Sequence, residues 1–177
     1  MRYWIPMIAF GVLLLLLMFG LNEDRDKNAL PSPFIGKQAP EYELPQLLDP
    51  SKTLSPASYS GKAVLINVWA TWCVGCRQEH DFLLALAAGD TIPIYGLNWR
   101  DNREEAILWL EQLGNPYVAS GYDGSGRVGI NWGVYGAPET FLIGADGTVL
   151  HKHLGPLSPF IWERDFAPLL GGMGSSK

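Results

Sequence analysis

The segment AVLINVWATWCVGCRQEH, residues 63–80, decides the fold of this chain. Its first part is a continuously apolar, β-branched run, which predicts a buried strand over residues 63–69. An aromatic turn follows, and the CVGC motif of residues 73–76 then opens a predicted helix over residues 73–88. The motif holds the only two cysteines of the 177 residues. A Cys-x-x-Cys pair between a strand and a helix favours a redox-active dithiol.

The position of the pair predicts a different role for each cysteine. Unpaired backbone N–H groups and the positive end of the helix dipole favour a thiolate at Cys73, which lowers its pKa. Because the thiolate is the attacking species in disulfide exchange, we expect Cys73 to attack first. Cys76, one helical turn further on, is expected to resolve the mixed disulfide that results.

Other sites that use cysteine fit these residues less well. A zinc site takes about four ligands, and the chain has no second cysteine pair. Haem attachment requires His directly after the second cysteine, where Arg77 stands. A structural disulfide across two residues would constrain the unfolded chain little. Copper stays open because His80, His151 and His153 exist, although none has a metal-like spacing to the pair. We therefore expect no metal and no cofactor.

Three further motifs accompany the cysteines: CRQEH at 76–80, GLNWRDN at 96–102 and GVYGAPETFLIG at 133–144. In this order, they resemble the membrane-anchored thiol:disulfide interchange proteins of cytochrome c maturation, the CcmG/DsbE group of the thioredoxin superfamily. The resemblance extends from about Gly36 to Leu170. It implies an α/β, thioredoxin-like fold with a central βαβ insertion, which residues 102–113 would supply with a helix.

The resemblance also implies acids at the active site. Thioredoxins usually carry a buried aspartate where this chain has Asn67, so another group is expected to take the proton of the resolving thiol. Glu79, three residues after Cys76, and Glu139 are the candidates that the resemblance provides. A partly buried carboxylate has a raised pKa and can accept such a proton. Glu139 is expected to matter more, because its loop faces the disulfide in the resembled fold. The alternative is that both are ordinary helix-surface and strand-entry residues.

Substrate binding is expected beside the same loop. The resemblance implies a cis bond between Ala137 and Pro138, which exposes the Ala137 backbone for pairing with an extended peptide. Trp72, directly before Cys73, offers a flat apolar surface. These residues are the predicted peptide-binding site.

The N-terminus predicts a membrane anchor over residues 1–21. Residues 3–21 are 19 uncharged, mostly apolar residues, about 28 Å long as a helix and sufficient for a bilayer core. Arg2 and the terminal amine are the only positive charges before this run, which favours a cytoplasmic N-terminus. A cleaved signal peptide is less consistent, because its apolar region is usually shorter and no small-x-small site follows. The polar residues 22–35 are expected to be a linker.

The remaining chain has the size of a single domain, expected at 36–171, with a flexible tail at 172–177. Alternating predicted strands and helices indicate an α/β layered fold. The predicted strands cover 63–69, 92–97, 117–120, 139–143 and 149–154, and a final helix covers 158–170. Leaving out Arg2, 12 basic and 18 acidic residues remain, a net charge of −6. With no basic-aromatic stripe, this composition argues against a nucleic-acid partner.

Taken together, the resemblance implies a single-pass protein of the bacterial inner membrane with a periplasmic dithiol–disulfide oxidoreductase domain. Its expected substrates are oxidised CxxCH cysteines of apocytochrome c, reached directly or through a haem-lyase thiol partner. A transmembrane carrier of the DsbD/CcdA type would resupply electrons. Three alternatives stay open: a general periplasmic thioredoxin-like reductase or oxidant, a copper metallochaperone, and a non-catalytic assembly scaffold.

Overall fold

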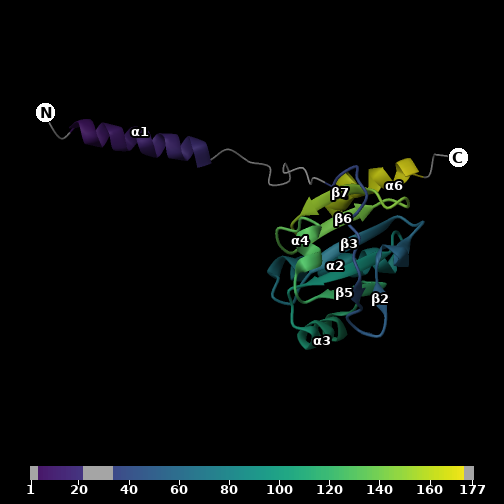
Figure 1. The fold of residues 1–177 in the computed structure, drawn as a ribbon. Coiled ribbons are helices and arrows are strands. Elements are labelled where there is room, and N and C mark those ends of the chain that lie inside the picture. The colour runs from purple at the N-terminus through teal and green to yellow at the C-terminus, as the bar shows by residue number, and fades with distance from the viewer. Residues whose placement is uncertain (1–3, 22–33, 174–177) are drawn as a thin grey trace. The chain divides into compact units, whose positions relative to one another are not determined.

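The structure is a computed structural model that describes residues 4–21 and 34–173, and the chain divides into two units. The first unit contains a helix, α1 (Trp4–Leu21) (Figure 1). Within residues 4–21 and 34–173, no helix is long and apolar enough to cross a bilayer. The anchor over residues 1–21 stays a prediction. The expected linker at 22–35 and tail at 172–177 lie mostly outside the described residues.

The second unit is built on a five-stranded sheet in the order β5-β4-β3-β6-β7 (Figure 1). β3 pairs in parallel with β4, and β4 pairs in parallel with β5. On the other side of β3, β6 is antiparallel, and β7 is antiparallel to β6. The strands are β3 (Val64–Trp69), β4 (Ile94–Trp99), β5 (Ala119–Asp123), β6 (Glu139–Ile143) and β7 (Val149–Leu154). This mixed sheet confirms the predicted α/β fold.

Helices connect the strands in the predicted order. α3 (Arg103–Leu113) joins β4 to β5 and completes the predicted central βαβ segment. Asn102 caps this helix by accepting a hydrogen bond from the backbone N of Glu105 at 3.0 Å. A hairpin of β1 (Leu44–Pro45) and β2 (Thr53–Leu54) precedes the sheet. The helices are α2 (Val74–Ala88), α3 (Arg103–Leu113), α4 (Arg127–Asn131), α5 (Pro159–Ile161), a π-helical turn (Trp162–Phe166) and α6 (Ala167–Met173).

Each face of the sheet has its own apolar core. One core packs Leu65 and Leu142 of the sheet against α2, α3 and the C-terminal helices, and it includes both cysteines. The other core packs Ile66 and Phe141 of the sheet against Trp132 and against residues that precede β3 in the same unit, such as Tyr42 and Leu54. The central strand β3 is buried on both faces, as its continuously apolar sequence predicts.

Two strands lie further along the chain than predicted. β4 was expected at 92–97 and is observed at Ile94–Trp99, and β5 was expected at 117–120 and is observed at Ala119–Asp123. The reason is the pairing of these ends, since Asn98 lies opposite Tyr122 and Trp99 lies opposite Asp123. Polar residues at strand ends resemble a loop in sequence, but the ladder satisfies their backbone groups.

Candidate active site

The two cysteines form a disulfide at the start of α2. Cys73 is the N-cap residue of this helix, and its Sγ accepts a hydrogen bond from the backbone N of Cys76 at 3.0 Å. Cys73 and Cys76 are 5% and 2% exposed, so Cys73 is only slightly more accessible than Cys76. A sulfur at this position faces N–H groups that would stabilise a thiolate after reduction.

The loop before β6 lies directly against the CVGC motif. The Ala137–Pro138 bond is cis, as the resemblance implies. A Cβ atom added to Gly75 would lie 2.8 Å from Cδ of Pro138 and 3.2 Å from Cγ of Pro156. The carbonyl of Pro138 accepts a hydrogen bond from the backbone N of Gly155 at 2.9 Å. The absence of a side chain at Gly75 is therefore what lets both prolines approach the motif.

The GLNWRDN motif holds the aromatic turn that precedes Cys73. Trp72 is 53% exposed, and its Nε1 donates to the carbonyl of Arg100 at 3.0 Å. Asp101 accepts hydrogen bonds from the backbone N of Thr71 at 2.8 Å and from its Oγ1 at 2.6 Å. Asp101 also accepts from Nδ2 of Asn98 at 2.8 Å. Asp101 was not among the predicted site residues, although a polar residue shortly after the end of a strand, here β4 at Trp99, was a usable signal.

A buried hydrogen-bond network links the centre of the sheet to α2. Nδ2 of Asn67 donates to Glu79 Oε1 at 2.8 Å and to Thr140 Oγ1 at 3.1 Å, and Oδ1 of Asn67 accepts from the Tyr117 hydroxyl at 2.8 Å. The second carboxylate oxygen of Glu79 accepts from the backbone N of Leu157 at 2.6 Å. The buried amide of Asn67 thus has a hydrogen-bond partner for both its oxygen and its nitrogen. The sequence analysis did not predict Tyr117 or Leu157 as members of this network.

Glu79 has the electrostatics expected of a proton acceptor. Glu79 is only 1% exposed. Burial raises the pKa of Glu79 to about 7, although the hydrogen bonds from Leu157 and Asn67 oppose the shift. It lies three residues after Cys76 on the same helix, so both lie on one face of it. This carboxyl group can therefore exchange a proton near neutral pH.

Glu139 lies on the other face of the sheet. Glu139 pairs with Val68 in β3, whereas Thr140 pairs with Asn67, and neighbouring residues of a strand point to opposite faces. Asn67 donates to both Glu79 and Thr140, so these side chains share one face of the sheet, and the Glu139 side chain points away from Glu79 and α2. The Glu139 carboxylate instead lies 2.9 Å from Nζ of Lys152. The structure does not bring the two predicted acids together.

The histidines form no metal site with the cysteines. Nε2 of His80 lies 3.1 Å from the carbonyl oxygen of Gly114, and its ring packs edge-on against Trp109. Within residues 4–21 and 34–173, no group of three or more His, Cys, Asp or Glu residues has the geometry to hold a metal ion. The copper alternative therefore has no preformed ligand set in this part of the chain.

Comparison with known proteins supports the same chemistry. The Redoxin family model matches residues 34–167. The chain is 44% identical over 169 residues to the thiol:disulfide interchange protein DsbE of Allochromatium vinosum, covering 96% of this chain and 92% of the relative. It is also 44% identical over 169 residues to DsbE of Escherichia coli, covering 93% of this chain and 91% of the relative.

Solved structures agree with the fold. A DsbE-type protein from Chlorobium tepidum superposes with a TM-score of 0.69 at 26% identity, covering 79% of this chain and 98% of that chain. A thioredoxin-type protein from Neisseria meningitidis superposes with a TM-score of 0.61 at 28% identity, covering 77% of this chain and 87% of that chain. With Cys73 and Cys76 as its redox-active pair, this chain belongs to the DsbE family of thiol:disulfide interchange proteins.

Proposed function

We propose that this protein reduces the disulfide of CxxCH segments in apocytochrome c, directly or through a haem-lyase thiol partner, during cytochrome c maturation. The observation that carries the proposal is the loop at Ala137 and Pro138, which lies against the CVGC motif through Gly75. Among the described residues, none hydrogen-bonds to the backbone of Ala137. An extended, unfolded peptide that contains cysteines could pair with this backbone as an added strand.

The exchange proceeds in two balanced steps. The Cys73 thiolate attacks one sulfur of the substrate disulfide, which forms a mixed disulfide and releases the other substrate sulfur as a thiolate. Cys76 then loses its thiol proton to the Glu79 carboxylate and attacks Sγ of Cys73. The substrate leaves as a dithiol after the released sulfurs take up protons. Two electrons have then passed from the protein to the substrate, and the Cys73–Cys76 disulfide has formed.

The oxidised protein needs a dithiol donor before it can react again. We propose a transmembrane carrier of the DsbD/CcdA type for this step, on the family resemblance. We also propose that residues 1–21 anchor the protein in the inner membrane and that the catalytic domain faces the periplasm. The support is the length of the uncharged run at residues 3–21 and the single Arg2 before it.

Covalent trapping tests the substrate. In a Cys76→Ser variant, the mixed disulfide at Cys73 cannot be resolved, so the partner stays attached and can be identified by mass spectrometry. We expect CxxCH-containing peptides of apocytochrome c or a thiol protein of haem attachment. The control is the Cys73→Ser/Cys76→Ser variant, which should trap nothing. Trapped proteins without any link to c-type cytochromes would instead favour a general periplasmic reductase or oxidant.

A second experiment tests the location. The mature protein should retain residues 1–21, and the domain should be digested by protease added to spheroplasts. A mature N-terminus beyond Leu21 would refute the anchor, and a domain protected from protease would refute its orientation.

A further inference from the structure

A buried ion pair underlies the loop that carries the cis proline. Nζ of Lys152 on β7 lies 2.9 Å from Oε2 of Glu139 on β6, and each side chain is 3% exposed. Lys152 lies opposite Phe141 in the sheet, so its side chain points to the same face as Phe141 and Glu139. This face packs Trp132 and Phe141, whereas the disulfide belongs to the core on the other face.

The pair holds three backbone groups of the loop. Oε1 of Glu139 accepts hydrogen bonds from the backbone N of Tyr135 at 2.7 Å and of Gly136 at 3.2 Å. Nζ of Lys152 donates to the carbonyl of Gly133 at 2.7 Å. The buried pair thus holds both ends of residues 133–136, the segment directly before Ala137 and Pro138.

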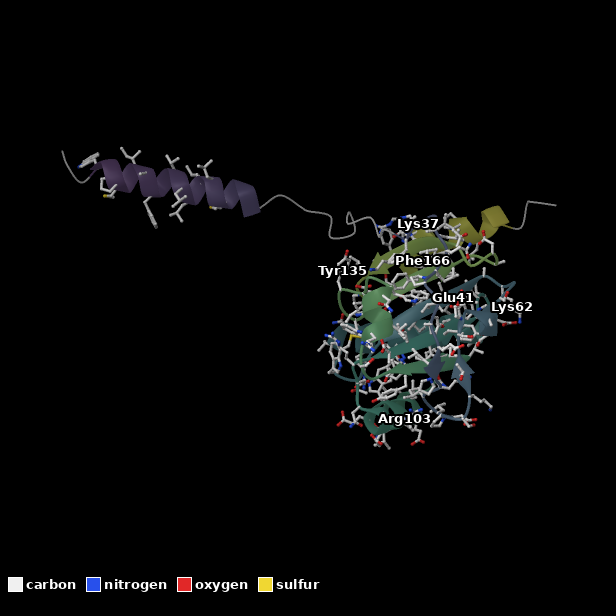
Figure 2. All side chains as sticks on the ribbon, in the orientation of Figure 1. Lys37, Glu41, Lys62, Arg103, Tyr135 and Phe166 are labelled. Atoms are coloured by element: carbon white, nitrogen blue, oxygen red, sulfur yellow. A yellow bond between two sulfur atoms is a disulfide. The ribbon has the colours of Figure 1, made fainter. Side chains whose placement is uncertain are left out.

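Lys152 also supports an exposed aromatic ring. Its Nζ lies 4.6 Å from the ring centroid of Tyr135 and 5.0 Å from that of Phe141. Tyr135 is 64% exposed, and Figure 2 shows its side chain extending from the surface of the domain. A cation beneath the ring stabilises this orientation of Tyr135.

Stability alone does not account for a buried ion pair at this place. Removing two charges from water is costly, and apolar residues of similar size often stabilise a protein as well or better. Apolar side chains, however, cannot donate to the carbonyl of Gly133 or accept from the N–H groups of Tyr135 and Gly136. What the two charges add is therefore the conformation of residues 133–136.

We propose that Lys152 and Glu139 are positioning residues that set the loop 133–138 for peptide docking and take no part in proton transfer. The inference rests on the docking of an extended peptide at Ala137, as argued under the proposed function. It predicts that peptide disulfides and small disulfides respond differently to loss of the pair. A small disulfide needs only the Cys73 thiolate, whereas a peptide also needs the loop.

The test measures reduction of two substrates by the pre-reduced full chain in a single turnover, with the chain and no other reductant as the source of electrons. The substrates are 5,5′-dithiobis(2-nitrobenzoic acid) and a disulfide-bonded peptide that contains a CxxCH segment. For Lys152→Met, we expect the second-order rate constant with the peptide to fall roughly tenfold or more, mainly because a higher peptide concentration is needed for the half-maximal rate, since small displacements of a docking loop have large effects. The rate with the small disulfide should stay within about twofold, since Cys73 keeps its helix N-terminus.

Two further variants keep the test decisive. Lys152→Met leaves Glu139 charged and buried, which can unfold the domain. The double variant Lys152→Met/Glu139→Gln removes both charges and should fold, yet it still lacks the donor to Gly133 and the cation beneath Tyr135. It should therefore show the same selective loss with the peptide. Lys62→Met, at an exposed position, is the matched control and should behave like the parent.

The outcomes separate the two proposals. Parental kinetics with the peptide in the folded double variant would overturn the inference. Equal losses with both substrates, or a shifted rate–pH profile with the small disulfide, would overturn it as well, because the pair would then act on the chemistry at Cys73. A parent chain that reduces the small disulfide but not the peptide would overturn peptide docking itself, and the inference with it.

Discussion

Asn67 donates a hydrogen bond from Nδ2 to Oε1 of Glu79 across 2.8 Å, in the interior between the central strand and the active-site helix. Residue 67 is an amide and not an acid, but Glu79, three residues after Cys76 on the helix, brings a carboxyl group to the same interior. Burial raises the pKa of the Glu79 carboxyl group to about 7, so it can gain and lose a proton in the neutral pH range in which thiols exchange disulfides. Of the two candidate acids, Glu79 is thus the one located on the active-site helix, and the strand contributes the hydrogen bond that orients it.

The two cysteines should differ in reactivity after reduction. Cys73 accepts a hydrogen bond from the backbone N of Cys76 and caps the helix, so its thiolate is stabilised. We expect Cys73 to be alkylated by iodoacetamide at least roughly tenfold faster than Cys76 near pH 7, with an apparent pKa below the ~8.5 of a free thiol. Peptide mapping by mass spectrometry measures both rates. Equal rates, or faster labelling of Cys76, would contradict the roles assigned to the two thiols.

Glu79→Gln should change the pH dependence of stability in a defined direction. The native state keeps the Glu79 proton up to about pH 7, whereas the unfolded state releases it near the ordinary value of 4.5. Between these values the unfolded state binds fewer protons, so the free energy of unfolding falls as pH rises, by roughly 3 kcal/mol in total. Glu79→Gln should remove this fall. Urea denaturation of both proteins at pH values from about 4 to about 8 measures this difference.

The same variant tests the chemistry. An amide at residue 79 can offer its oxygen to the backbone N of Leu157 and its NH₂ group to Asn67, whose own amide can rotate to accept. The fold should therefore be retained, while the rate of peptide reduction near neutral pH should fall roughly tenfold to a hundredfold. Its rate–pH profile should lose the step near pH 7, and that of Glu139→Gln should keep it. A step preserved in Glu79→Gln would show that proton transfer proceeds through water.

Gly75→Ala should impair substrate reduction through a steric effect. The added Cβ atom would lie 2.8 Å from Cδ of Pro138, so the proline loop must move away from the cysteines. We expect a decrease of roughly tenfold in kcat/KM for a peptide disulfide. Gly171→Ala, at an exposed position of α6, is the matched control, because a Cβ atom there meets nothing within 4 Å. If both variants reduce the peptide at the parental rate, the contact between Gly75 and Pro138 is not needed for exchange.

Asp101→Ala should destabilise the domain and loosen the turn that carries Trp72. Asp101 accepts two hydrogen bonds from Thr71 and one from Asn98, and its loss leaves these donors without a partner. We expect the free energy of unfolding to fall by about 2–4 kcal/mol. Asp81→Ala, an exposed acid of α2, is the control and should change stability by less than about 0.5 kcal/mol. Guanidinium denaturation of both variants provides the comparison, and equal midpoints would contradict the assigned role.

Local sequence signals were sufficient for the elements that build the site. The predicted strands 139–143 and 149–154 are observed with the same bounds, because β-branched and aromatic residues flank an Asp-Gly turn at residues 146–147. Cys73 lies at the first turn of α2, and Asn102 caps α3, because both depend on residues within one helical turn. The cysteine pair itself determined the chemistry, since no other residue type in the chain exchanges disulfides.

Only the tertiary structure decided which of the two candidate acids lies on the same face of the sheet as the disulfide. Alternation along a strand requires Glu139 and Thr140 to point to opposite faces, but it does not say which face carries α2. The pairing of Thr140 with Asn67 decides this, and it joins residues 73 positions apart. The pKa of Glu79 depends on burial and on the backbone N of Leu157, 78 residues away. Contacts of this kind arise from the packing of distant segments, so neither the partner of Glu139 at Lys152 nor the acid–amide pair of Glu79 and Asn67 could be inferred from local sequence.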